Sequence, residues 1–365
     1  MKGIVRSATL VVAILAVGLF AGWLLSGGAE PRFTTALPVP PSPAPEGQNG
    51  LSDSDRTAFY HLSEGGELFP LDLVLALEQD YVADDGSVQL RPFLDNIERY
   101  GLLPDPKKPG NEEGLPVGVS LGVSKAEGIE MVGLNCAACH VGQVQYNGHP
   151  VRIDGLGNMV VVNDFLRGIV EQTTKTIASP QRLDRFWKRL DDVRDERRKR
   201  GVAGLFEKDE RTLRRVFGTS DREGALSRIL DLFTRNRPLL DAQLDTLRAL
   251  PSLVKSIDVG TQPGYGRLDA FGIGRDELFG PADPLNFTPP SAPVSLPHIW
   301  GLQYTGWLQW GANTNSVMER NIGQALGVGT VFNARTFESS ARINNLHRLE
   351  QLAYHIAPPE WPAAI

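Results

Sequence analysis

Cys136-Ala137-Ala138-Cys139-His140 contains both cysteines of this 365-residue chain, and we expect the rest of the fold to form around it. A Cys-x-x-Cys pair is typical of a thiol redox centre, of half a zinc site or of a covalent haem attachment site. A zinc site needs two more ligands at matching spacing, and the sequence has no second cysteine pair. A redox pair does not require the histidine that follows. His140 therefore favours haem attachment.

The order of the residues in this motif suits haem chemistry. Two thiols add across the vinyl groups of the haem, and the adjacent histidine becomes the proximal ligand of the iron. One helical turn separates the thiols, so both sulfurs can meet one edge of the porphyrin. The sequence predicts one covalent haem c, bound by Cys136, Cys139 and His140, with His140 as the metal ligand.

The first 28 residues have the pattern of an export segment. Lys2 and Arg6 precede an uncharged, largely apolar run over residues 8–25, so the positive-inside rule places the remaining chain outside the cytoplasm. The run is long for a signal-peptide core and adequate for a membrane span, and cleavage before Ala29 stays open. We predict a protein on the periplasmic side of the inner membrane, anchored there or released by cleavage of the signal.

Composition divides the chain into four parts. Residues 1–28 are followed by a tether over 29–52, which is rich in proline, alanine and glycine. We expect a c-type haem domain over 53–357, with a helical insertion at about 179–255, and the start of a linker over 358–365. The predicted fold class is mostly α: a cytochrome-c-like haem domain with long ordered loops and a charged helical insertion, preceded by an N-terminal membrane segment.

Hydrophobic residues at helical spacing predict individual helices. Ser179 is placed to cap one of them, with Pro180 at its first position and Gly201 beyond its end. Its charged faces are interpreted as a solvated insertion, or alternatively as a docking surface. Further helices are expected at 163–174, 220–235, 317–326 and 344–357, and no convincing sheet is expected. Residues 111–123 are interpreted as loop. Residues 151–153 and 160–162 could be strands, but we expect them to be ordered loop around the haem.

Composition also limits the classes of partner. Hydrophobic residues make up 41% of the chain and charged residues 22%, values that are ordinary for a globular protein. A formal net charge of −6 provides no basic surface for nucleic acid, so we expect no nucleic-acid partner. The same charge would suit a basic redox partner protein.

Residues 294–322 resemble the segment that follows the first haem of bacterial dihaem cytochrome c peroxidases. Trp310 matches the tryptophan of the family pattern Gln-Phe-Trp-Asp-Gly-Arg, and residues 316–319 fall where Thr/Ser-Leu-Glu-Glu stands. The wider superfamily includes the MauG enzymes and rubber oxygenases of the RoxA kind. Residues 60–65 and 114–118 look more like the rubber-oxygenase branch.

This resemblance, which covers roughly residues 55–360, implies a haem-dependent oxidoreductase that uses peroxide or dioxygen at the iron. Members of the superfamily carry another Cys-x-x-Cys-His motif in a C-terminal domain, and this sequence contains none. We therefore expect the chain to represent the first-haem portion, with the second haem domain missing. The implied partners are a small-molecule oxidant and either a redox partner protein or a second haem domain.

The resemblance also implies residues for the distal pocket, where a carboxylate can move the proton of a peroxide. Alignment on Trp310 places Leu308 and Met318 at the two family positions, with Gln309 and Glu319 one residue further on. Gln309 and Glu319 are thus the candidate catalytic residues, and Trp310 is expected to contact the cofactor. The alternative interpretation is that Gln309 and Glu319 are surface residues.

The sixth ligand of the iron separates two functions. A second strong ligand would close the iron and favour an electron-transfer cytochrome, whereas an open site would admit peroxide or dioxygen. Met159 is our first candidate for such a ligand, and His149 and His298 are others. A haem-bearing structural or docking module is a third possibility. Arg152 and Arg267 are candidate partners for a haem propionate.

Overall fold

The Cys-x-x-Cys-His motif forms a short helix, α4 (Cys136–His140), between strands β5 (Glu130–Leu134) and β6 (Val141–Tyr146). Asn135 caps α4, because its side chain accepts a hydrogen bond from the Ala137 amide at 3.0 Å. The computed structural model describes residues 50–83, 85–124, 130–146, 148–201, 263–279, 288, 290–309, 311–330, 332 and 337–360.

Strands surround the motif in sequence and in space. A three-stranded antiparallel sheet has the order β1-β5-β4, in which β1 is Phe69–Pro70 and β4 is Val119–Val123. Strands β6 and β7 (His149–Asp154) form a hairpin that begins directly at the end of α4. Two further antiparallel pairs lie elsewhere in the described chain: β2 (Glu78–Val82) with β3 (Val88–Pro92), and β8 (Arg267–Leu268) with β9 (Val294–Ser295).

The fold is therefore mixed α/β, and the prediction of a mostly α, cytochrome-c-like fold is wrong. The segments over 119–123 and 151–153 that we interpreted as loop are strands, because each pairs with a partner that local periodicity does not reveal. The expected membrane segment over 1–28 lies outside the described residues. Within the described ranges, no helix is long and apolar enough to cross a membrane.

Glycine allows the close approach between β5 and the chain before β1. A Cβ on Gly133 would lie 2.5 Å from the carbonyl oxygen of Gly66, which is closer than any side chain tolerates. The neighbouring Leu68 amide donates to the Val132 carbonyl at 2.9 Å, so the two backbones are joined here. This contact holds the strand that leads into the motif.

The helices confirm several predictions. Ser179 caps α6 (Pro180–Lys199) by accepting from the Arg182 amide, with Pro180 in its first turn. Helix α11 covers Val317–Leu326, as predicted, and α12 covers Ile343–Tyr354. The helix predicted at 220–235 lies outside the described residues. The other helices and 3-10 turns in the described ranges are α2 (Asp53–His61), α3 (Leu71–Ala76), α5 (Val162–Ala178), α10 (Ala270–Phe279), η1 (Phe93–Asn96), η2 (Glu98–Tyr100) and η5 (Leu302–Tyr304).

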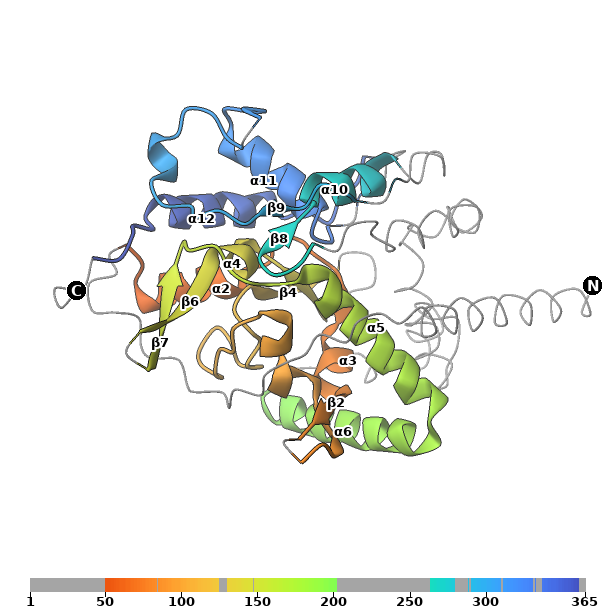
Figure 1. Cartoon of the computed structure of the whole chain (residues 1–365). Helices are drawn as coiled ribbons and strands as arrows, with labels where there is room; N and C mark the ends of the chain where they lie inside the picture. Colours follow the sequence, from red (N-terminus) through yellow and green to blue (C-terminus); the bar gives the residue numbers. More distant parts are fainter. Residues whose placement is uncertain are drawn as a thin grey trace, which may run out of the picture. The chain divides into compact units, whose positions relative to one another are not determined.

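Helix α6 packs against α3 and α5, so it is not surrounded by solvent on all of its faces (Figure 1). Phe186 and Leu190 are buried on its inner face. Arg197, near its C-terminal end, is only 1% exposed and is surrounded by carboxylates. This part of the charged stretch therefore belongs to the body of the described fold.

Helix α4 lies between two hydrophobic clusters. Ala138 and Cys139 pack with the cluster that contains Phe93 and Phe165, whereas Ala137 and Cys136 pack with the cluster of α2 and α12. Figure 1 shows α4 beside α2, with α11 and α12 on the adjoining part of the molecule. The motif is thus placed where the two parts of the core meet.

Candidate haem attachment site

The two thiols lie one turn apart on α4 and are both partly exposed. Between them, Ala137 and Ala138 are 0% and 1% exposed. The helix consequently buries its alanine face in the core, and both cysteines lie together on another face, as partly buried residues packed against the core clusters. This is the arrangement that attachment to one porphyrin edge requires.

His140 presents one ring nitrogen for a metal. Its Nδ1 lies 2.9 Å from the carbonyl oxygen of Pro297, and a carbonyl only accepts, so Nδ1–H is the donor. That hydrogen bond leaves the lone pair on Nε2, the tautomer found in histidine ligands held by a backbone carbonyl. Burial, assisted by the positive charge of Arg320, lowers the pKa of His140 to about 4. The imidazole is therefore neutral at neutral pH, as ligation needs.

Glu64 is a buried carboxylate that sequence analysis did not single out. It is 0% exposed, and its Oε1 accepts from the Cys136 amide at 2.8 Å and from the Cys136 thiol at 3.0 Å. Its Oε2 accepts from Gln324 Nε2 at 3.0 Å. Burial raises the pKa of Glu64 although these hydrogen bonds oppose the shift. Glu64 therefore joins the start of α4 to helix α11.

Both thiols resist ionisation. Burial, together with the charge and the hydrogen bond of Glu64, raises the pKa of Cys136 well above its ordinary value. Burial also raises the pKa of Cys139 to about 12, against the opposing charge of Arg320. Disulfide exchange depends on the thiolate, so this pair is poorly suited to a redox role. Addition of a protonated thiol to a vinyl group agrees better with the site.

Helix α11 supplies polar side chains next to the motif. Gln324 Oε1 lies 3.9 Å from Cys136 Sγ, and Arg320 Nη1 lies 3.4 Å from the same amide oxygen. Residues four apart share one face of a helix, so Arg320 and Gln324 face the motif together. This side of the site thus carries a cation and an amide.

These residues fit a c-type haem. Two sulfurs share one helix face, a neutral histidine offers Nε2, and hydrophobic side chains of two clusters flank the helix. A zinc site fits less well, since the described part of the chain holds no group of three or more His, Cys, Asp or Glu suited to a metal ion. A cavity of about 190 Å³, lined in part by Glu78 and Phe186, is too small for haem and has no motif residue in its lining.

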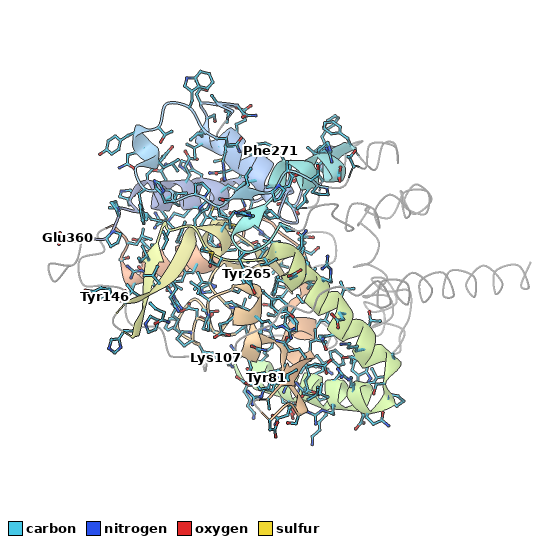
Figure 2. The ribbon with its side chains drawn as sticks, in the orientation of Figure 1. Tyr81, Lys107, Tyr146, Tyr265, Phe271 and Glu360 are labelled. Carbon is cyan, nitrogen blue, oxygen red and sulfur yellow. The ribbon has the colours of Figure 1, made fainter. Side chains whose placement is uncertain are left out.

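The residues expected to form the distal pocket lie on exposed chain. Gln309 is exposed and has a left-handed backbone with φ of 66°, and Trp307 is 60% exposed. Glu319 is also exposed, and its carboxylate accepts from the Thr314 hydroxyl. Trp310 lies outside the described residues. Other exposed aromatic side chains, such as Phe271 at 61%, can be followed in Figure 2. The assignment of Gln309, Glu319 and Trp310 stays a prediction.

The candidate sixth ligands are also at the surface. Met159 is 63% exposed, and His149 and His298 are exposed. His61, by contrast, is buried with its ring nitrogens 2.8 Å from Asp105 and 3.0 Å from the Val119 carbonyl. Each of these side chains is thus either turned to the surface or already engaged.

The two arginines proposed for a propionate differ in environment. Arg152 is 7% exposed and donates to the Pro104 carbonyl at 2.7 Å, near Asp105. Arg267 is exposed on β8. Arg320, which the sequence interpretation did not consider, is the arginine whose charge acts on the motif.

Two sequence signals could have indicated the missed residues. Glu64 lies within the stretch over 60–65 that carries part of the family resemblance, and Arg320 directly follows the matched stretch over 316–319. The four-residue spacing of Arg320 and Gln324 on a predicted helix also places them on one face. Neither signal, however, shows that this face is turned toward Cys136.

Comparison with known proteins adds one relative of unknown role. The chain is similar to the uncharacterized protein y4iJ of Sinorhizobium fredii, with 28% identity over 358 residues, which covers 87% of this chain and 52% of that protein. The chain therefore spans about half the length of this curated relative. No protein-family model matches the sequence. No solved structure matches it either.

Proposed function

We propose that this chain is an exported c-type cytochrome that binds one haem c through Cys136 and Cys139, with His140 as proximal ligand. The proposal extends to a haem-dependent oxidoreductase of the dihaem peroxidase or oxygenase type, which uses peroxide or dioxygen. The observation that carries it is the geometry of α4: two cysteines one turn apart on one face of the helix, followed by a histidine whose Nδ1 donates to the Pro297 carbonyl.

Several residues of the chain would each have a separate role in positioning the haem-binding motif. Haem, when bound, supplies an iron centre capable of redox chemistry. The Pro297 carbonyl orients the His140 ring, and Glu64 holds the first amide of α4. Ala137 and Ala138 fix the buried face of the helix. Together these contacts keep the motif in one position relative to the core.

We favour an open site over an electron-transfer cytochrome, because the resemblance to dihaem peroxidases and oxygenases implies an iron that admits peroxide or dioxygen. A closed iron would require a second strong ligand, for which Met159, His149 and His298 are the candidates. In the ferric spectrum of the haem-loaded protein, a high-spin form is the expected outcome. A low-spin form would instead place the electron-transfer function first.

Export is part of the proposal, because c-type haem is attached outside the cytoplasm. Its basis is the order of Lys2, Arg6 and the apolar run over residues 8–25, which lie outside the described chain. A reporter that is active only outside the cytoplasm, fused after Gly50, should be active. An inactive fusion would remove this part of the proposal. A basic redox protein or a second haem domain would supply or take the electrons.

Covalent attachment is tested most directly by acid–acetone extraction. After maturation in a host competent for c-type haem, pigment should stay on the polypeptide. Cys139→Ser should weaken attachment, whereas His140→Ala should alter the spectrum even where attachment survives. Val88→Ala is the control, since this exposed side chain on β3 has no part in the proposed site and should leave both readouts unchanged. Pigment that passes wholly into the solvent from the unmodified protein would refute haem c binding.

A further inference from the structure

The chain that follows β7 binds the C-terminal end of α4. The Gly155 amide donates to the His140 carbonyl at 2.8 Å, and the Asn158 amide donates to the Cys139 carbonyl at 2.9 Å. The Asn158 side chain also donates to the Ala138 carbonyl at 2.9 Å. The last carbonyls of a helix lack partners within it, so these three bonds fix the end of α4 on the chain after β7.

The segment that contains Pro297 is bound to the same stretch, residues 154–158. The indole Nε1–H of Trp300 donates to the Asp154 carbonyl at 2.8 Å. Three residues earlier, the Pro297 carbonyl accepts from Nδ1–H of His140 at 2.9 Å. One stretch of chain therefore holds both the helix that carries His140 and the segment that orients its ring.

Glycine at position 155 lets the indole reach this carbonyl. A Cβ on Gly155 would lie 2.5 Å from Nε1 of Trp300, which is closer than any side chain tolerates, and the residue has a left-handed φ of 80°. The Ile299 amide donates to the Gly155 carbonyl at 2.9 Å and joins the two backbones beside the indole. The approach of Trp300 to β7 is thus built into the backbone.

Helix α2 fixes the residue whose carbonyl Trp300 binds. Asp154 is 2% exposed, and its carboxylate accepts from the Tyr60 hydroxyl at 2.6 Å and from Arg56 Nε at 2.8 Å. Both carboxylate oxygens are therefore held by α2, independently of Trp300. The indole hydrogen bond joins the segment with Pro297 to an acceptor that is already in place.

We propose that Trp300 is a positioning residue, whose indole N–H holds the Pro297 carbonyl in place for Nδ1–H of His140. The inference rests on the proposed haem function and adds a residue that sets the basicity of the proximal ligand. When a metal is bound at Nε2, a hydrogen bond from Nδ1–H makes the imidazole a more basic ligand. A more basic ligand stabilises ferric over ferrous iron, so a displaced Pro297 carbonyl should favour the ferrous form.

A purely structural role is the competing explanation, because Trp300 also packs against the hydrophobic cluster of α2 and α12. Two substitutions separate the hydrogen bond from the packing. Trp300→Phe keeps a six-membered aromatic ring and removes the N–H. Trp300→His removes the six-membered ring and keeps an N–H at the same position of the five-membered ring. The first variant therefore loses the hydrogen bond, and the second loses most of the packing.

Redox titration of the haem-loaded full chain compares the variants at about pH 8, where an introduced histidine is neutral. Trp300→Phe should shift the ferric–ferrous equilibrium toward the ferrous form by about two- to tenfold, the range of one neutral hydrogen bond. Trp300→His should shift it by less than about twofold, because that bond is kept. Urea-induced unfolding should show the larger loss of stability in Trp300→His.

Tyr81→Phe is the control, because it removes a polar hydrogen from an aromatic side chain on β2, a strand that contacts α5 and η1. Its reduction potential should equal that of the unmodified protein. An unchanged potential in Trp300→Phe, or an equal or larger shift in Trp300→His, would overturn this inference and leave haem c binding intact. Pigment extracted by acid–acetone from the unmodified protein would overturn the proposed function, and this inference with it.

Discussion

Two arginines in this molecule, Arg197 and Arg320, have different electrostatic environments. Arg197, near the end of α6, is 1% exposed and contacts Asp72, Glu113 and Glu130; its Nη1 lies 2.6 Å from Glu113. Arg320, on α11, donates within the described chain to the amide oxygens of Asn321 and Gln324, and its charge acts on the buried carboxylate of Glu64 without a direct ion pair. A cation in direct ion pairs holds neighbouring elements together, whereas a cation separated from a carboxylate by an amide acts on it through charge alone.

The largest effect should come from Arg197→Met. The substitution removes the cation that lies between Asp72, Glu113 and Glu130, although Glu113 keeps its ion pair with Arg200 at 2.9 Å. We expect a cost of about 3–5 kcal/mol, the value of a broken buried ion pair. Urea-induced unfolding should show this loss. Arg320→Met is the comparison variant and should lose less stability, because within the described chain its hydrogen bonds go to the neutral side chains of Asn321 and Gln324. Equal losses in the two variants would abolish the distinction between the two arginines.

A smaller, pH-dependent effect is expected at Asp80, where α5 and α6 meet β2. Burial acts to raise the pKa of Asp80, but hydrogen bonds and charges from Lys175 at 3.0 Å and Arg182 at 2.6 Å outweigh it, so the pKa is lowered. A carboxyl group whose pKa is lower in the folded than in the unfolded state stabilises the folded state at pH values above 3.8, its pKa in the unfolded state. This stabilisation is lost as the pH falls through the lower pKa of the folded state.

Asp80→Asn should therefore be less stable than the unmodified protein at pH 7, by about 1 kcal/mol at most for a partly exposed pair. The difference between the two proteins should shrink progressively below about pH 4. Chemical unfolding at pH 7, 5 and 3 measures it. A constant difference across this range would show that Asp80 acts through packing and not through charge.

The smallest effect concerns the start of α11. Ser316 Oγ accepts from the Glu319 amide at 3.2 Å and caps the helix that carries Arg320. Ser316→Ala should cost about 1 kcal/mol, the usual value of a helix cap. Thermal unfolding measures it, with Ser316→Asp as the control that keeps a capping oxygen. If Ser316→Ala were neutral, the position of Arg320 would depend on tertiary contacts alone.

The sequence predicted those elements whose signals are local. Residues 317–326 show helical periodicity, and Ser179 with Pro180 marks the start of α6; both helices begin and end close to the predicted residues. Strands β4 and β5 were missed because their identity depends on pairing with each other and with β1, some 60 residues away in sequence. A glycine-rich stretch such as 111–123 has no local preference that reveals such pairing.

The candidate site likewise has one part that the local sequence predicts and another part that depends on residues distant in sequence. The motif over 136–140 follows from adjacent residues and needs no tertiary information. The contact between Glu64 and Gln324 joins residues 260 positions apart, and Pro297 is 157 positions from His140. No single-sequence pattern relates such distant residues. The short helix that carries the motif was thus predictable, and the groups that surround it were not.

The shortness of α4 has a consequence for the order of folding. A five-residue helix is not stable in isolation, because isolated helices need roughly 12–15 residues. Here Asn135 donates to the carbonyls of Phe59 and Leu62, and Glu64 accepts from Cys136, across 72 to 76 positions of chain. The motif can become helical only once residues 59–64 have docked. In the nascent polypeptide the two thiols therefore lie on a segment that is not yet helical, and they are open to solvent before the long-range contacts enclose them.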